Sequence, residues 1–229
     1  MHLLINISRF FALIVLTLSL YSCSHVAEEA AADENQYSYK DIEKWDKKKP
    51  DYVNPFTPGT YRHFIARPDY PQTYDAWQDA ELLKKANGRN SKIIVEIATQ
   101  RGKMMVDNQM VLNFPISTGV SSFPTKTGNY QIISRHSDHK SNLYGTIYDA
   151  EGKAVKYDAD MTVDAIPEGG RFEGSAMPYF MRLTNAGLGL HVGKVRRRPC
   201  SHGCIRTPRE VCKTIFEKVT VGTPVDVVP

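Results

Sequence analysis

Residues 92–118 read KIIVEIATQRGKMMVDNQMVLNFPIST. Apolar and β-branched residues form short runs in this stretch, and the pairs Arg101-Gly102 and Asp107-Asn108 separate the runs as turns do. Later segments share this composition: GNYQIIS (128–134), LYGTIYD (143–149) and PVDVV (224–228). The pattern predicts a meander of β-strands from Lys92 onward, with the last segment as a closing strand.

Two helices are predicted. Thr207-Pro208-Arg209-Glu210 has the composition of a capping box, with Thr207 as N-cap, and the apolar residues that follow give the helix one buried face before Gly222 ends it. A shorter helix is expected from Thr73 to about Asn87. The fold expected for the C-terminal part is therefore mainly β with one packed helix.

Composition is that of an ordinary globular protein, with 229 residues, 41% hydrophobic residues and a net charge of +4. The positive charge lies in the C-terminal part, because residues 92–229 carry 18 basic and 13 acidic side chains. Much of it is clustered at Lys194, Arg196, Arg197, Arg198, Arg206 and Arg209. Such a cluster suits an acidic substrate or an anionic surface. Nucleic acid is not expected as a partner, because no binding motif or interleaved aromatic run accompanies the cluster.

The N-terminal residues predict export. The apolar run FFALIVLTLSL (10–20) follows Arg9 and is too short for a membrane span of roughly 20 residues, but it suits a signal peptide over residues 1–22. Leu20-Tyr21-Ser22-Cys23 resembles a bacterial lipobox, which implies lipidation of Cys23. Plain secretion with an unmodified cysteine is the alternative, since Tyr21 is bulkier than the usual residue. Residues 23–91 are expected to form a tether, flexible to about Lys49, and an N-terminal extension.

The segment HVGKVRRRPCSHGCIR (191–206) carries the chemistry. Cys204 follows a glycine, so its backbone can approach a substrate closely, and His191 is placed to act as its base, with a backbone carbonyl holding the second ring nitrogen. The predicted helix begins three residues later, and its positive end would favour a thiolate. The alternatives are a buried structural cysteine with surface histidines, or a metal site. His191, Cys200, His202 and Cys204 are possible ligands, but the spacing C-x-H-x-C does not suit one tetrahedral ion, so no metal is predicted.

The motifs together resemble the L,D-transpeptidase catalytic domain. They are SHGCIR (201–206), the preceding His191, and the turn FPTKTGNY (123–130), in which Phe123 replaces the usual threonine. The resemblance covers residues 92–228 and implies a β-sandwich or barrel-like catalytic domain without cofactors. It implies that Cys204 forms a thioester with a tetrapeptide stem of peptidoglycan and releases D-alanine. An amine of a second stem would then complete a 3→3 cross-link. Hydrolysis by water, attachment of a protein to the wall, and a non-catalytic wall-binding lipoprotein are the alternatives. The expected location is the cell envelope, as a periplasmic or outer-membrane lipoprotein facing the wall.

The resemblance also implies supporting roles. Backbone N–H groups of His202, Gly203 and Cys204 would bind the oxyanion, with Ser201 in support. His202 would orient the loop, and Arg206 would brace it or meet a stem carboxylate. Tyr179, Arg196 and Arg197 are expected at the substrate, although Tyr179 has packed core as its alternative. Cys212 is expected to be a buried small hydrophobic residue on the helix. In an oxidising compartment, Cys200 could instead pair with Cys212 as a structural disulfide or with Cys204 as a reversible lock, and the sequence does not separate the two. His136 and His139 are expected in a solvated loop.

Overall fold

The computed structural model describes residues 37–229, which form two compact units, residues 37–70 and Pro71–Pro229. The predicted signal peptide and Cys23 lie outside the described residues. None of the helices within that described part has the length and apolar character needed to cross a bilayer.

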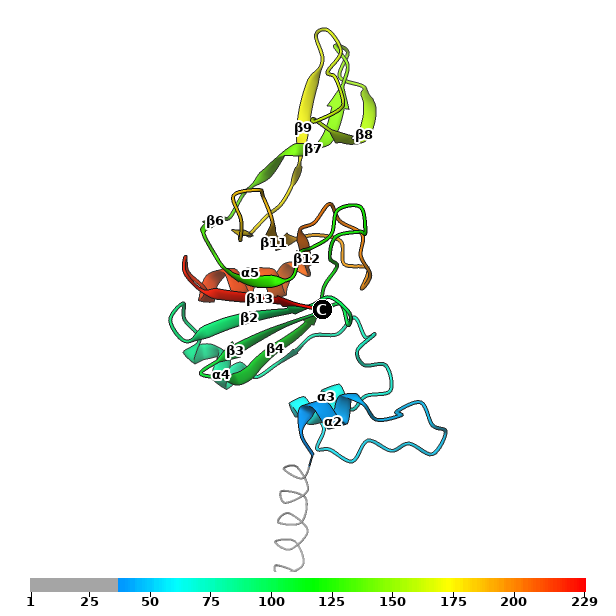
Figure 1. Cartoon of the computed structure of the whole chain (residues 1–229), viewed down its shortest axis with the longest axis vertical. Coiled ribbons are helices and arrows are strands. Elements are labelled where there is room, and N and C mark those ends of the chain that lie inside the picture. The colour runs from blue at the N-terminus through cyan, green and yellow to red at the C-terminus, as the bar shows by residue number, and fades with distance from the viewer. Residues whose placement is uncertain (1–36) are drawn as a thin grey trace, which may run out of the picture. The chain divides into compact units, whose positions relative to one another are not determined.

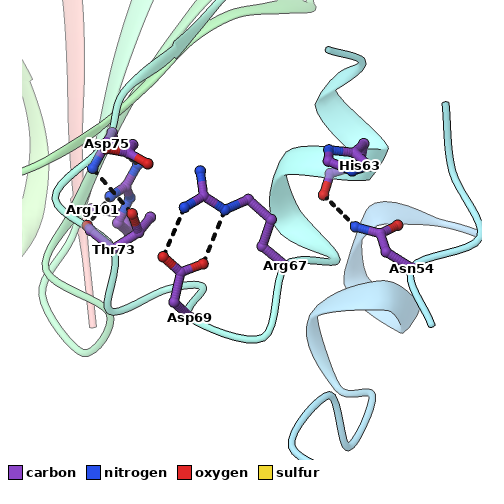
Figure 2. Close-up of polar contacts among 7 residues, drawn as sticks. All are labelled: Asn54, His63, Arg67, Asp69, Thr73, Asp75 and Arg101. Carbon is purple, nitrogen blue, oxygen red and sulfur yellow. Dashed lines mark hydrogen bonds and ion pairs between the residues drawn. The ribbon is translucent and has the colours of Figure 1, made fainter. Parts of the chain in front are cut away.

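The first unit contains two short helices, α2 (Tyr39–Glu43) and α3 (Tyr61–Ile65). Ser38 and Thr60 cap them with their hydroxyl groups. Ile42 of α2 is fully buried, so the predicted flexible tether does not reach Lys49. Two polar contacts hold the unit's irregular segments. Asn54 Nδ2 donates to the carbonyl of His63 at 2.9 Å, and Arg67 Nη2 pairs with Asp69 Oδ2 at 2.8 Å (Figure 2).

The second unit is built on a six-stranded sheet in the order β1-β4-β3-β2-β13-β5 (Figure 1). The strands are β1 (Trp77–Gln78), β2 (Ser91–Glu96), β3 (Arg101–Val106), β4 (Gln109–Pro115), β5 (Gly128–Gln131) and β13 (Pro224–Val228). The predicted meander is confirmed for β2, β3 and β4, which pair antiparallel in sequence order. The predicted closing strand β13 runs parallel to β2 and antiparallel to β5, inside the sheet.

The predicted helix from Thr73 to Asn87 is wrong in its first half. Only α4 (Ala80–Lys85) is helical, capped by Asp79, and β1 pairs with β4 before it. The cause is Arg101, a fully buried side chain that the sequence did not single out. Its guanidinium donates from Nη1 to the Thr73 carbonyl at 3.0 Å and from Nη2 to the Asp75 carbonyl at 3.1 Å, which holds this segment extended (Figure 2).

A four-stranded sheet in the order β12-β11-β10-β6 carries the candidate site. Its strands are β6 (Ser134–His136), β10 (Phe180–Arg182), β11 (Gly189–Val192) and β12 (Ile205–Thr207). The packed helix α5 (Arg209–Lys218) lies between this sheet and the six-stranded one (Figure 1), and its residues Cys212 and Ile215 are fully buried in the shared core. The predicted capping box is wrong, because Thr207 belongs to β12. Pro208 is the N-cap and makes no side-chain hydrogen bond.

A third sheet is inserted between β6 and β10. It contains β7 (Lys140–Tyr148), β8 (Ala154–Asp160) and β9 (Arg171–Ala176) in the order β8-β7-β9, and it extends away from the other two sheets (Figure 1). Only β7 was predicted. The mainly β fold class is confirmed, with 35% of the described residues in strands and 13% in helices.

Candidate active site

Cys204 and His191 lie on neighbouring parallel strands. Cys204 directly precedes β12, which pairs with β11 in the register Leu190↔Ile205 and His191↔Arg206. Leu190 and Ile205 are fully buried in the core, and successive side chains alternate between the faces of a sheet. His191, Cys204 and Arg206 therefore share the opposite face. Strand spacing and rise place the Cα atoms of His191 and Cys204 about 8 Å apart, within reach of their side chains.

His191 is held in one tautomer. Its side chain is buried, and Nδ1 lies 2.8 Å from the carbonyl oxygen of Val192, so Nδ1 carries the proton and Nε2 keeps its lone pair. Burial lowers the pKa of His191 to about 4, and the charges of Arg206 and His139 act in the same direction, against the bond to Val192. The imidazole is therefore neutral near pH 7 and able to accept a proton at Nε2.

The thiol of Cys204 is also neutral in the resting state. Burial raises its pKa, whereas the backbone N–H of Gly189 and the charges of Arg182 and Arg206 lower it. Its Sγ donates to the Gly187 carbonyl at 3.4 Å. The predicted help from the helix is weaker than expected, because α5 begins at Arg209 and strand β12 separates it from Cys204. Both groups are therefore neutral near pH 7 and do not form a standing ion pair.

Two buried hydroxyl groups fix the loop that carries the nucleophile. Ser201 Oγ donates to the carbonyl of Cys204 at 2.5 Å and accepts from the Gly203 N–H at 3.2 Å. Thr125, from the turn after β4, donates to the Gly203 carbonyl at 2.5 Å and accepts from the Gly119 N–H at 2.8 Å. The supporting role of Ser201 in catalysis stays a prediction, and the contacts of Thr125 are not indicated by the sequence.

The loop that carries Cys204 packs so closely against residues 117–119 that a side chain at Gly119 has no room. A Cβ at Gly119 would lie 2.0 Å from the Phe123 carbonyl oxygen and 2.8 Å from the Gly203 Cα. The backbone of Gly203 has φ +108°, a conformation that favours glycine. Glycine is therefore needed at both positions to seat the nucleophile.

The three expected oxyanion donors are not equivalent. The Gly203 N–H is already bonded to Ser201, so it is not free for a substrate. Among residues 37–229, the backbone N–H groups of His202 and Cys204 donate to no protein acceptor, which leaves these two as candidates.

Arg206 lies in contact with Cys200. Arg206 packs over Gly193 and directs Nη1 to Cys200 Sγ at 3.7 Å.

Cys212 is fully buried, its thiol donates to the Tyr179 carbonyl, and burial raises the pKa of that thiol to about 12. Cys200, Cys204 and Cys212 are all free, so neither predicted disulfide is formed in this structure. In the described part of the chain, His, Cys, Asp and Glu side chains form no group of three or more that would hold a metal ion.

The predicted substrate-binding residues differ in their surroundings. The ring of Tyr179 packs against Phe216 of α5, with centroids 5.4 Å apart, as expected of its core alternative. Arg197 lies over the ring of Tyr74 at 3.9 Å, and Arg196 is exposed, with its backbone N–H bonded to Ser117 Oγ. Contact of these residues with a substrate stays a prediction.

The histidines of the predicted solvated loop are placed differently. His136 is exposed but belongs to β6, and His139 is half-buried with its ring stacked on Phe180 at 4.5 Å. Burial and the charge of Arg182 lower the pKa of His139.

An aromatic cluster beside the nucleophile was missed by sequence reasoning. His202 stacks on Tyr144 of β7 at 4.3 Å, and Phe123 meets the His202 ring edgewise at 4.9 Å. Asp160 is paired directly with Tyr144 across β7 and β8. Burial raises the pKa of Tyr144, and the charges of Asp160 and Cys204 add to the shift. Nothing in the spacing of Tyr144 and Asp160 linked them to Cys204, because the third sheet brings them there.

The comparisons cover the same part of the chain. The family model of the YkuD L,D-transpeptidase catalytic domain matches residues 90–227. None of the curated proteins matches this chain in sequence. Similar solved structures include an L,D-transpeptidase from Mycobacterium smegmatis (19% identity, TM-score 0.46, covering 61% of this chain and 59% of that one). Another is an L,D-transpeptidase from Enterococcus faecium (24% identity, TM-score 0.44, covering 62% and 50%).

This chain thus spans about three fifths or less of these two solved structures. The family match includes both strands of the site, the nucleophile loop and Thr125. Since it extends over more than half of the residues, the chain belongs to the L,D-transpeptidase catalytic domain family.

Proposed function

We propose that this protein is an L,D-transpeptidase that acts on peptidoglycan stems through a thioester on Cys204. The observation that carries the proposal is the placement of His191 and Cys204 on one face of the neighbouring strands β11 and β12, with both groups neutral and His191 Nδ1 bonded to the Val192 carbonyl. A general base of this kind removes the thiol proton as sulfur attacks a carbonyl.

In the first half-reaction, Cys204 Sγ attacks the carbonyl carbon of the third residue of a tetrapeptide stem while its proton passes to His191 Nε2. The oxyanion that forms accepts hydrogen bonds from the N–H groups of His202 and Cys204. The C–N bond to the terminal D-alanine then breaks, and His191 returns the proton to the leaving amine. The product is an S-acyl enzyme and free D-alanine.

In the second half-reaction, the side-chain amine of a second stem attacks the thioester carbonyl. Its proton passes through His191 to the departing sulfur, which regenerates the thiol and leaves a 3→3 cross-link. Water in place of the amine gives a carboxypeptidase. The candidate function from another class is non-catalytic binding to the wall. The hydrogen bond between His191 Nδ1 and the Val192 carbonyl argues against it, because wall binding does not require one fixed tautomer of His191.

Two measurements test the proposal. A carbapenem should add one covalent adduct to the intact protein by mass spectrometry, and Cys204→Ala should prevent it. Purified stem peptides incubated with the protein should release D-alanine and form cross-linked dimers that depend on Cys204. An adduct-free wild-type protein that still binds sacculi would favour the non-catalytic alternative, and D-alanine release without dimers would favour the carboxypeptidase.

Location in the cell envelope follows from this substrate, and the predicted signal peptide and lipobox support it. We propose anchoring through Cys23. Metabolic labelling with a fatty acid should mark the wild-type protein, and Cys23→Ala should remove the label and release the protein from membranes.

A further inference from the structure

Arg182 of β10 is a charged neighbour of the nucleophile that the reaction above does not use. Arg182 is paired with Gly189 of β11, whose backbone N–H acts on the Cys204 thiol. Its Nη1 lies 3.9 Å from the position of a Cβ added to Gly187, and the Gly187 carbonyl accepts the Cys204 thiol at 3.4 Å. The guanidinium and the thiol therefore share Gly187 as a neighbour.

The charge of Arg182 has no carboxylate partner in the described part of the chain. None of the ion pairs among residues 37–229 includes it, and its guanidinium lies over the Phe180 ring at 5.1 Å instead. Its charge lowers the pKa of His139 and that of the Cys204 thiol, so both groups lie within its electrostatic range. A half-buried guanidinium without a carboxylate partner is suited to bind one from a ligand.

We propose that Arg182 binds the terminal carboxylate of the donor stem, on the residue that leaves when Cys204 is acylated. This inference rests on the proposed function. The carbonyl attacked by Sγ and the carboxylate of the leaving residue are separated by one residue, about 3.8 Å along the chain. The short path from Sγ through Gly187 to Arg182 is consistent with that separation. Binding there would select stems that end in a free carboxylate one residue after the cleaved bond.

The test measures binding without turnover. Cys204→Ala is titrated calorimetrically with three tetrapeptides: one with a free terminal carboxylate, one with a terminal amide, and one in which only the carboxylate on the diamino acid side chain is amidated. We expect the terminal amide to bind about 10- to 100-fold more weakly, because a charge-assisted pair is lost and the guanidinium stays unpaired. Arg182→Gln in the same background should bind the free acid as weakly as the amide.

Two variants control for charge and folding. Arg89→Gln removes one exposed positive charge elsewhere in the same unit and should keep the full preference for the free acid. Arg182→Lys keeps the charge without the fork of donors and should keep part of the preference. If Arg182→Gln does not fold, the partial loss in Arg182→Lys carries the test, because a role limited to packing on Phe180 would weaken acid and amide equally.

The outcomes separate this inference from the proposed function. An unchanged preference in Arg182→Gln would overturn the inference alone. A preference that follows the side-chain carboxylate would overturn the assignment to the leaving residue. If the protein with Cys204 releases no D-alanine while the Arg182-dependent preference holds, the proposed reaction fails and the carboxylate site stands.

Discussion

Replacing Thr125 by valine should loosen the nucleophile loop while keeping the shape of the side chain. The buried hydroxyl makes two hydrogen bonds, to the Gly203 carbonyl at 2.5 Å and from the Gly119 N–H at 2.8 Å. Each bond contributes about 1 kcal/mol net, and an orphaned buried group costs about 1–3 kcal/mol, so we expect Thr125→Val to lower the free energy of unfolding by about 2–4 kcal/mol. For a unit of this size, that corresponds to a fall in Tm of about 4–16 °C.

The activity of Thr125→Val should fall by more than the loss of folded protein at the assay temperature explains. The Gly203 carbonyl is adjacent to Cys204, and a displacement of about 1 Å at a reacting group costs on the order of 100-fold in rate. Urea unfolding measures the first effect, and the rate of acylation by a carbapenem measures the second. Thr125→Ser should restore both. Thr127→Val, at an exposed position of the same turn, is the matched control and should change neither. A Thr125→Val protein within 0.5 kcal/mol of wild type and fully active would refute the bracing argument.

Three further predictions concern groups around the nucleophile. The pKa of His191 is about 4 in the folded protein and near 6.5 in the unfolded chain. The unfolded chain therefore binds the proton first as the pH falls, and the free energy of unfolding should decrease by about 3 kcal/mol between pH 6.5 and 4. His191→Gln should remove that part of the pH dependence of unfolding. In the wild type, the acid limb of kcat/KM should likewise lie near pH 4, and a limb near 6.5 would contradict the buried neutral imidazole. Tyr144→Ala removes the ring that stacks on His202 and should slow acylation about 10-fold with a small change in Tm. Tyr144→Phe keeps the ring and should keep the rate of acylation. Equal losses of rate in the two variants would exclude the stack as the cause. In native protein at pH 8, iodoacetamide should modify the half-buried Cys200 and leave the buried Cys212 unmodified. Peptide mapping identifies the labelled cysteines, and rapid labelling of Cys212 would contradict its burial.

Local patterns in the sequence were enough for the central strands. The runs between residues 92 and 117 contain alternating or continuous apolar residues with clear turns, and β2, β3 and β4 form there as predicted. The motif around Cys204 also indicated the loop that Ser201 braces, because the residues involved are adjacent in the chain.

Errors arose where distant residues override local preference. Thr207 looks like an N-cap, but backbone pairing with β11 places it in a strand, and the helix begins after it. Thr73 looks like another, but the buried Arg101 binds the carbonyl groups nearby and keeps the segment extended. Propensity is a weak guide at such positions.

Site residues were missed for a related reason. Tyr144, Asp160 and Arg182 are separated from Cys204 by 22 to 60 positions, and no spacing rule connects them. Sheet pairing brings Arg182 opposite Gly189, and the third sheet brings Tyr144 to His202. Only the three-dimensional arrangement identifies them.

Strand β13 has a consequence for the order of folding. It pairs with β2 on one side and β5 on the other, so a strand far from both partners in the chain occupies an interior position of the six-stranded sheet. Strand β5 joins the other strands of that sheet only through β13, and such non-local pairings form slowly. Packing of α5 against the sheet depends on the same step. The six-stranded sheet and the packing of α5 against it should therefore be completed late in folding.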